Sequence, residues 1–114
     1  MAANPGFGTF VNIIRAAQTA AQQGVPFNAA PYTNFTVYLT GTGTITSGVI
    51  TVFEAAQTSY GGTWSTVTTQ DADAVSAGAV LAIHLQTGAY RALRVDITTL
   101  IGGGGSLQVD LAAW

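Results

Sequence analysis

From residue 35 to the C-terminus, apolar and polar side chains alternate in short runs separated by glycine-rich turns. Such alternation puts one set of side chains on each face of an extended strand, and a helix cannot produce it. The clearest alternating runs begin at Phe35, Leu93 and Leu107, and a run from Val49 is apolar on both faces, as in a covered strand. Residues 64–69 have the threonine-, valine- and tryptophan-rich composition of a strand, and a further run covers residues 79–85. Short strands at this spacing predict an all-β fold, and specifically an antiparallel, jelly-roll-like β-sandwich.

The last two runs are joined by the glycine-rich loop of residues 102–105, which predicts a β-hairpin. If the apolar residues of both strands share one face, each apolar residue must lie directly opposite an apolar residue of the other strand, so the numbers of paired residues add up to an even number. The register that best fits the loop pairs Ile97 with Leu107, Val95 with Val109, and Leu93 with Leu111. It also places Arg94 opposite Asp110 on the outer face, where the ion pair would contribute about 0.2–1 kcal/mol.

Residues 1–34 show another pattern and are predicted to form an N-terminal arm, separate from a sandwich domain of residues 35–114. Phe10, Ile13, Ile14 and Ala17 recur at the spacing of one helical face, and Thr9 is a suitable N-cap. Prolines on both sides of this segment favour extended linkers. We expect one short amphipathic helix, whose apolar face packs either on its own sheet or on a neighbouring subunit.

Fixed charges are rare in this chain. Three arginines and five acidic residues make up 7% of the 114 residues, and lysine is absent. About a quarter of an average soluble domain is charged, and few charges leave little repulsion between copies. We therefore expect much of the surface to be covered, in a homo-oligomer or by another partner. The predicted interface residues are Phe10, Ile13, Ile14, Ala17, Tyr90, Arg91 and Trp114.

The composition also argues against several kinds of partner. Without a basic patch, the chain lacks the electrostatic footprint of a nucleic-acid-binding protein. No apolar run approaches the ~20 residues that a membrane span needs, and no signal-peptide pattern is evident at the N-terminus. Because the chain has no cysteine, it can form neither disulfides nor thiolate metal sites. We expect neither nucleic acid nor membrane as a partner.

The sequence shows no arrangement typical of an enzyme. His84 is the single histidine and lies in an apolar strand, without a Gly-x-Ser-x-Gly or His-x-x-x-His pattern. Asp71 and Asp73 could bind calcium, but a third acidic ligand is missing nearby, so a solvated turn is favoured. No lysine follows the glycine run, which favours a hairpin tip over a phosphate-binding loop. We expect no catalytic activity, no cofactor and no metal.

Three segments resemble a pattern common in bacteriophage structural proteins. They are ITVFEAAQTSYGGTW at residues 50–64, YRALRV at residues 90–95, and the glycine-rich segment at residues 102–111. The resemblance covers roughly residues 35–114 and implies a small β-sandwich of the kind used in virion shells, tails and fibres. For a short, nearly uncharged chain, a capsid decoration (cement) protein fits best. That resemblance implies a trimer on the outer capsid surface, which binds the major capsid protein and stabilises the shell.

Two other functions stay open. One is a virion protein associated with the tail or fibre. The other is a carbohydrate-binding module, which requires aromatic side chains lined up on one exposed face. The candidates for such a platform are Tyr32, Tyr38, Tyr60 and Trp64, although Trp64 could instead cap the core. A hydrolase is disfavoured because the sequence lacks a recognisable combination of acid, base and nucleophile.

Overall fold

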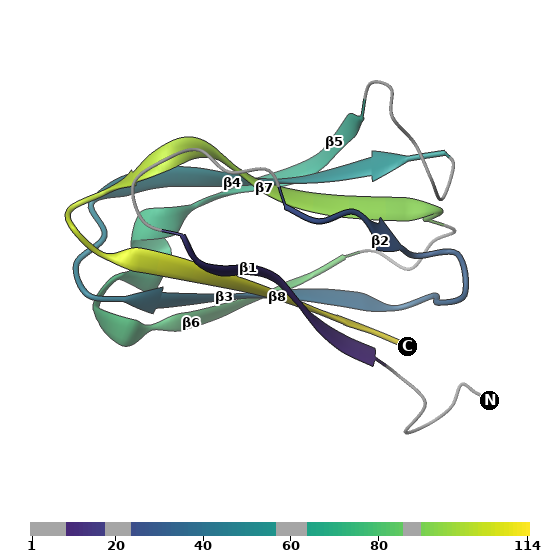
Figure 1. The fold of residues 1–114 in the computed structure, drawn as a ribbon, viewed down its shortest axis with the longest axis horizontal. Helices are drawn as coiled ribbons and strands as arrows, with labels where there is room; N and C mark the ends of the chain where they lie inside the picture. The colour runs from purple at the N-terminus through teal and green to yellow at the C-terminus, as the bar shows by residue number, and fades with distance from the viewer. Residues whose placement is uncertain (1–8, 18–23, 57–63, 86–89) are drawn as a thin grey trace.

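The computed structural model describes residues 9–17, 24–56, 64–85 and 90–114, and these form two antiparallel sheets packed face to face (Figure 1). Sheet A consists, in spatial order, of β1 (Thr9–Ala17), β8 (Ser106–Ala113), β3 (Phe35–Thr42) and β6 (Val80–His84). Sheet B consists of β2 (Phe27–Asn28), β7 (Ala92–Gly102), β4 (Ser47–Ala55) and β5 (Ser65–Asp71). This strand order is that of a jelly roll and confirms the predicted all-β sandwich.

The hydrophobic core lies between the sheets. Its largest fully buried side chains include Phe35, Leu39, Ile50, Leu93, Ile97, Ile101, Leu107 and Leu111. In β3 the odd-numbered residues from 35 to 39 belong to this core, as the alternation predicted. Burial of each side chain of this size stabilises the fold by about 1.5–3 kcal/mol relative to exposure. The alternating residues are therefore what holds the two layers together.

A short 3-10 segment, η1 (Ala72–Gly78), connects β5 to β6 and packs against β3 and β4. Ala72 and Val75 are buried, and the Ser76 hydroxyl accepts a hydrogen bond from the Ile45 N–H at 2.8 Å. Ala77 has a positive φ of 63°, where the chain turns into β6. Over the described ranges, no helix has the length and apolar character needed to cross a bilayer.

The predicted amphipathic helix is wrong, because residues 9–17 form β1, an edge strand of sheet A that pairs with β8. The register of this pairing shifts between Asn12 and Ile14, and again between Ile14 and Ala17. Such irregularities interrupt the two-residue alternation and leave the apolar residues at spacings that imitate a helical face. The β-branched side chains of Val11 and Ile13 favour the extended conformation.

Two strands within the predicted arm belong to the sandwich, since β1 is part of sheet A and β2 is part of sheet B. The chain before β2 is held against sheet B, where the Gly24 N–H donates a hydrogen bond to the Asp96 carboxylate at 3.0 Å. A Cβ atom at Gly24 would overlap the Val95 carbonyl, so this close approach requires glycine. The predicted boundary at residue 34 therefore falls between two strands of the same sandwich.

The predicted terminal hairpin is wrong as well. β7 pairs with β4 and β2 in sheet B, whereas β8 pairs with β1 and β3 in sheet A. The glycine-rich loop carries the chain from one sheet to the other, with positive φ at Gly103 and Gly104. Ile97 and Leu107 consequently lie on facing inner surfaces, and Arg94 forms its ion pair with Asp96 of its own strand.

The register of β1 can be tested with two substitutions. Ile13 is 7% exposed and belongs to the core, whereas Phe10 is 63% exposed, although a helix would place both on one face. We expect Ile13→Ala to lower the free energy of unfolding by about 2–4 kcal/mol. Phe10→Ala should lower the free energy of unfolding by less than about 1 kcal/mol. Denaturant unfolding followed by circular dichroism measures both, and equal losses would contradict this register.

Candidate interaction surface

The outer face of sheet A is built from alternate residues of its four strands. The strand register places Phe10, Ala112, Thr36 and His84 in one row across the sheet. The next row consists of Asn12, Asp110, Tyr38 and Ala82, and a third contains Gln108, Thr40 and Val80. These residues are called the A face below.

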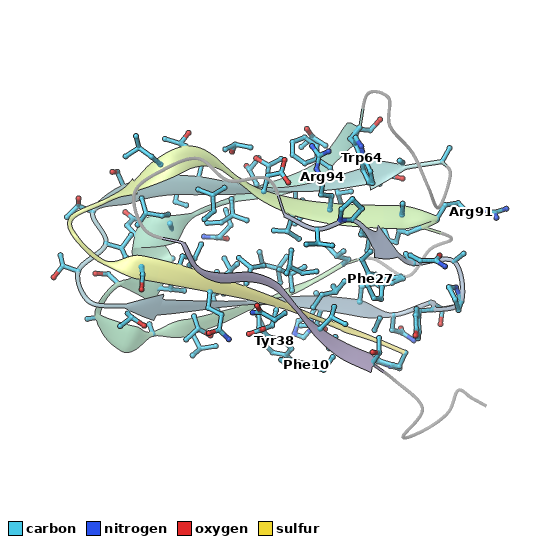
Figure 2. All side chains as sticks on the ribbon, viewed as in Figure 1. Phe10, Phe27, Tyr38, Trp64, Arg91 and Arg94 are labelled. Carbon is cyan, nitrogen blue, oxygen red and sulfur yellow. The ribbon has the colours of Figure 1, made fainter. Side chains whose placement is uncertain are left out.

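Aromatic and aliphatic side chains form the exposed apolar part of the A face. Phe10 and Tyr38 pack with their ring centroids 6.1 Å apart, and both project from the outer side of the layer (Figure 2). Val80, on the opposite edge strand of the sheet, is 62% exposed. Between these positions, Thr36 Oγ1 and His84 Nδ1 are hydrogen-bonded to each other at 3.0 Å. The A face thus combines exposed apolar groups with polar groups that are hydrogen-bonded to each other.

Asp110 is the one fixed charge among the residues of the A face, and only 5% of it is exposed. Its two carboxylate oxygens accept hydrogen bonds from Asn12 Nδ2 and Gln108 Nε2, each at 2.9 Å. A buried carboxylate needs such donors because its desolvation is otherwise strongly unfavourable. The residues that define the A face therefore present almost no charge to a partner.

On sheet B, the charges of Arg94 and Asp96 compensate each other. Arg94 donates to the Asp96 carboxylate through Nε at 3.0 Å and Nη2 at 2.9 Å. The guanidinium carbon of Arg94 lies 5.1 Å from the Phe53 ring centroid and 4.9 Å from that of Trp64. Figure 2 shows Trp64 beside Arg94 on this layer. Because cation–π contacts and the ion pair hold Arg94 in the folded structure, it is poorly placed to bind a partner.

A cleft of about 330 Å³ opens between the sheets where β5 and β6 form adjacent edges. Its lining residues are Val67, Thr68, Ile83, His84, Leu85 and Tyr90. The Tyr90 ring packs edge-on against Phe35, with centroids 5.5 Å apart. Burial raises the pKa of the Tyr90 hydroxyl and the Glu54 carboxylate raises it further, so this group is neutral at pH 7. The cleft is lined by aliphatic side chains and by hydrogen-bonding groups.

The N-terminal residues predicted for the interface do not share one surface. Phe10 lies on the A face, whereas Ile13 is buried in the core and cannot contact a partner. The side chains of Ile14 and Ala17 lie outside the described part of the chain. Phe10 is therefore the member of this group that the structure places on an exposed surface.

The other predicted interface residues lie toward one end of the sandwich. Tyr90 lines the cleft, and Arg91 precedes β7 and points away from the ribbon in Figure 2. Trp114 is 47% exposed, and its backbone N–H donates to the Asn34 carbonyl at 3.0 Å. These three residues do not join Phe10 in the strand rows that define the A face.

Sequence reasoning missed Tyr38, Val80 and Ala82 as members of the candidate surface. The alternation in β3 and β6 indicates that these residues face away from the core. It does not indicate that Phe10 lies nearby, because β1, β3 and β6 come together through pairings between distant parts of the sequence. The sequence signal for this surface is that the outward-facing residues of one strand, Thr36, Tyr38 and Thr40, are all uncharged.

The described aromatic candidates for carbohydrate binding lie in separate places. Tyr32 stacks on Phe27, with centroids 5.7 Å apart, while Tyr38 lies on the outer side of sheet A and Trp64 on that of sheet B. Tyr60 lies outside the described residues.

The two acidic residues of the calcium hypothesis lie at the end of β5 and in η1: Asp71 is the last residue of β5, and Asp73 belongs to η1. The described residues include no group of three potential metal ligands.

The same fold occurs in two solved structures. One is the crystal structure of the SPBc2 prophage-derived protein YomS, with a TM-score of 0.65 and 11% identity over 93% of this chain and 91% of that chain. The other is reported for Bacillus endospore appendages, a family of disulfide-linked pili. It has a TM-score of 0.53 and 18% identity, and the match covers 94% of this chain and 85% of that chain. At these identities, the similarity shows the fold alone. No protein-family model matches the sequence, and no curated protein matches it.

The ion pair on sheet B generates a stability prediction. We expect Arg94→Ala to lower the free energy of unfolding by about 3 kcal/mol, because Asp96 keeps its buried charge without its cationic partner. The free energy of unfolding of the double variant Arg94→Ala/Asp96→Ala should fall by less than the sum of the losses measured for the two single variants, Arg94→Ala and Asp96→Ala. Arg91→Ala, at an exposed arginine, is the control and should cost less than about 0.5 kcal/mol. Additive losses in chemical denaturation would contradict a coupled pair.

Proposed function

We propose that this chain is a non-enzymatic structural protein of a bacteriophage particle, and specifically a capsid decoration protein that binds across major capsid protein subunits and stabilises the shell. The observation that carries the proposal is the A face, whose one fixed charge, Asp110, is buried beside neutral amides. Because hardly any charge on this face remains to be desolvated, covering it with another protein costs little. Such a surface suits permanent burial in an assembly.

The exposed apolar side chains supply the driving force for that burial. Phe10 and Val80 are both more than half exposed, at opposite edges of the A face. Burial of each side chain contributes up to about 1.5–3 kcal/mol, before the costs of ordering and association. The Phe10 ring already packs against Tyr38, which reduces the freedom that it loses on binding. The A face is thus a largely preformed apolar contact surface.

The fold is compatible with a location on the outer surface of a capsid. A prophage-derived protein has the same jelly roll along nearly its whole length, which supports a phage origin for this architecture. The charge scarcity of the whole sequence is the second support, because a dispersed protein gains solubility from charges that this chain lacks. Both features agree with a subunit that is covered on one side by the shell.

A subunit of a tail, fibre or other filamentous appendage is the second candidate. The similarity to the endospore appendage structure favours it. Those appendages are described as disulfide-linked, whereas this chain contains no cysteine. A filament of this protein would therefore have to be held together by non-covalent contacts.

Binding to capsids tests the decoration proposal. We expect the purified protein to co-sediment with capsids of its phage that lack it, and to remain bound between about 0.1 and 1 M NaCl, because apolar contacts are not screened. Phe10→Glu should weaken binding at least tenfold, because it puts an unpaired charge into the contact. Thr69→Glu, an exposed change on sheet B, is the matched control and should bind normally.

Three outcomes would contradict the proposal. The first is release from capsids at high salt, which would indicate a charged contact. The second is equal binding of the Phe10→Glu and Thr69→Glu variants, which would remove the A face from the interface. The third is recovery of the protein with tails but not with capsids, which would favour the appendage candidate. Binding to a glycan array, in turn, would favour the carbohydrate module.

A further inference from the structure

The four edge strands of the sandwich differ in their protection against pairing with another strand. The register of β1 shifts twice, β2 contains only two residues, and the pairing of β5 with β4 is irregular. Bulges, short strands and charged residues are the devices that natural proteins use to block sheet edges. β6 has none of them: its sequence VLAIH contains no Asp, Glu, Lys, Arg, Pro or Gly, and its register with β3 is unbroken.

The backbone of β6 has hydrogen-bonding groups that point away from sheet A. At its two ends, the Gly41 N–H donates to the Ala79 carbonyl and the Leu85 N–H donates to the Phe35 carbonyl, each at 3.1 Å. In an antiparallel ladder the inward and outward residues alternate. The N–H and C=O groups of the even-numbered residues Val80, Ala82 and His84 therefore face outward, along the open edge.

The side chains next to this edge are also incompletely covered. Leu81 and Ile83 face the core, yet both are only partly buried. Ile83 lines the cleft between the sheets, together with Val67 of β5 and Tyr90. A strand added to β6 would hydrogen-bond to its backbone and would also place an apolar side chain beside this cleft. The edge thus offers both the polar and the apolar part of a strand-binding site.

We propose that two copies of this chain pair through β6, antiparallel about a two-fold axis at Ala82. In this register Ala82 lies opposite Ala82 of the second copy, and Val80 lies opposite His84. All three residues have outward backbone groups, so each N–H meets a carbonyl across the axis. Leu81 then packs beside Ile83 of the second copy, on the side of the core. Sheet A becomes one continuous sheet across the pair.

A second copy suits this edge better than an unrelated strand because β6 is complementary to itself. Pairing brings no two like charges together, since the strand has no acidic or basic residue other than the single histidine. The residue on the axis is alanine, so the outer surface is not crowded where the copies meet. The pair does not depend on a capsid, and its test is therefore independent of the decoration proposal. A trimer, which the resemblance implies, would require a different contact.

Proline at the centre of β6 tests the pairing. The Ala82 N–H points outward, so Ala82→Pro removes the hydrogen bond that each copy donates across the axis but none to β3. We expect the purified protein and the Ala82→Ser control, which keeps a small residue on the axis, to sediment as dimers, and Ala82→Pro to have half that mass. Circular dichroism and the thermal unfolding midpoint show whether the proline variant is folded. A dimeric Ala82→Pro variant, or a monomeric or purely trimeric parent protein, would overturn the proposal.

A cross-link provides a second test that does not depend on the proline variant. The chain has no cysteine, so Ala82→Cys introduces the only thiol. Across a hydrogen-bonded antiparallel pair the Cα atoms are about 5.5 Å apart, within the range of a disulfide. Under mild oxidation, we expect at least tenfold faster formation of covalent dimer than in Thr69→Cys, whose residue is exposed on sheet B. Equal rates would overturn the proposal.

Discussion

The contact between the two apolar inner faces is the constraint on which the rest of this structure depends. In β3 and β8 the odd-numbered residues 35, 37, 39, 107, 109, 111 and 113 belong to the core, so the residues between them face the other side of the sheet. The chain fills many outward positions with threonine, serine and glutamine instead of charged residues. Two of the charges on the sheets have local partners: Arg94 forms an ion pair with Asp96, and Asp110 accepts hydrogen bonds from two amides. The result is a sandwich whose exterior carries few charges.

The alternation that builds this core also determines how much of the fold can be predicted from the sequence. The sequence predicts β3 to β8 to within a few residues. In β3, β7 and β8 the signal is a two-residue period, whereas β5 is indicated by a composition rich in threonine, valine and tryptophan. The period does not identify the neighbours of a strand. Ile97 and Leu107 satisfy the same pattern whether they share a sheet or face each other across the core. The glycine loop between their strands fits a hairpin and a crossing between sheets equally well, and β1 was mistaken for a helix because register shifts disturb its period.

The candidate surface was less predictable for the same reason. The scarcity of charge indicates a covered surface, but its position depends on strand register. Phe10 reaches Tyr38 because β1 and β3 both flank β8, and nothing in the sequence connects those two aromatic residues. The helical spacing predicts Ile13 and Phe10 on one interface, yet a strand directs these two side chains to opposite faces. Long-range pairing, and not residue type, decides which apolar residues remain available to a partner.

The A face and the β6 edge can be occupied at the same time because they lie in different directions. Edge pairing extends sheet A within its own plane, whereas a shell would cover the sheet from outside. A two-fold axis perpendicular to sheet A keeps both A faces on one side, so a pair would present two copies of the same apolar surface to a shell. If both A faces of a pair can bind the shell at the same time, the pair binds more tightly than a single copy, although each A face makes the same contact as before. A surface of moderate affinity would then be sufficient for stable decoration, and that is consistent with a chain that exposes only a few large apolar side chains.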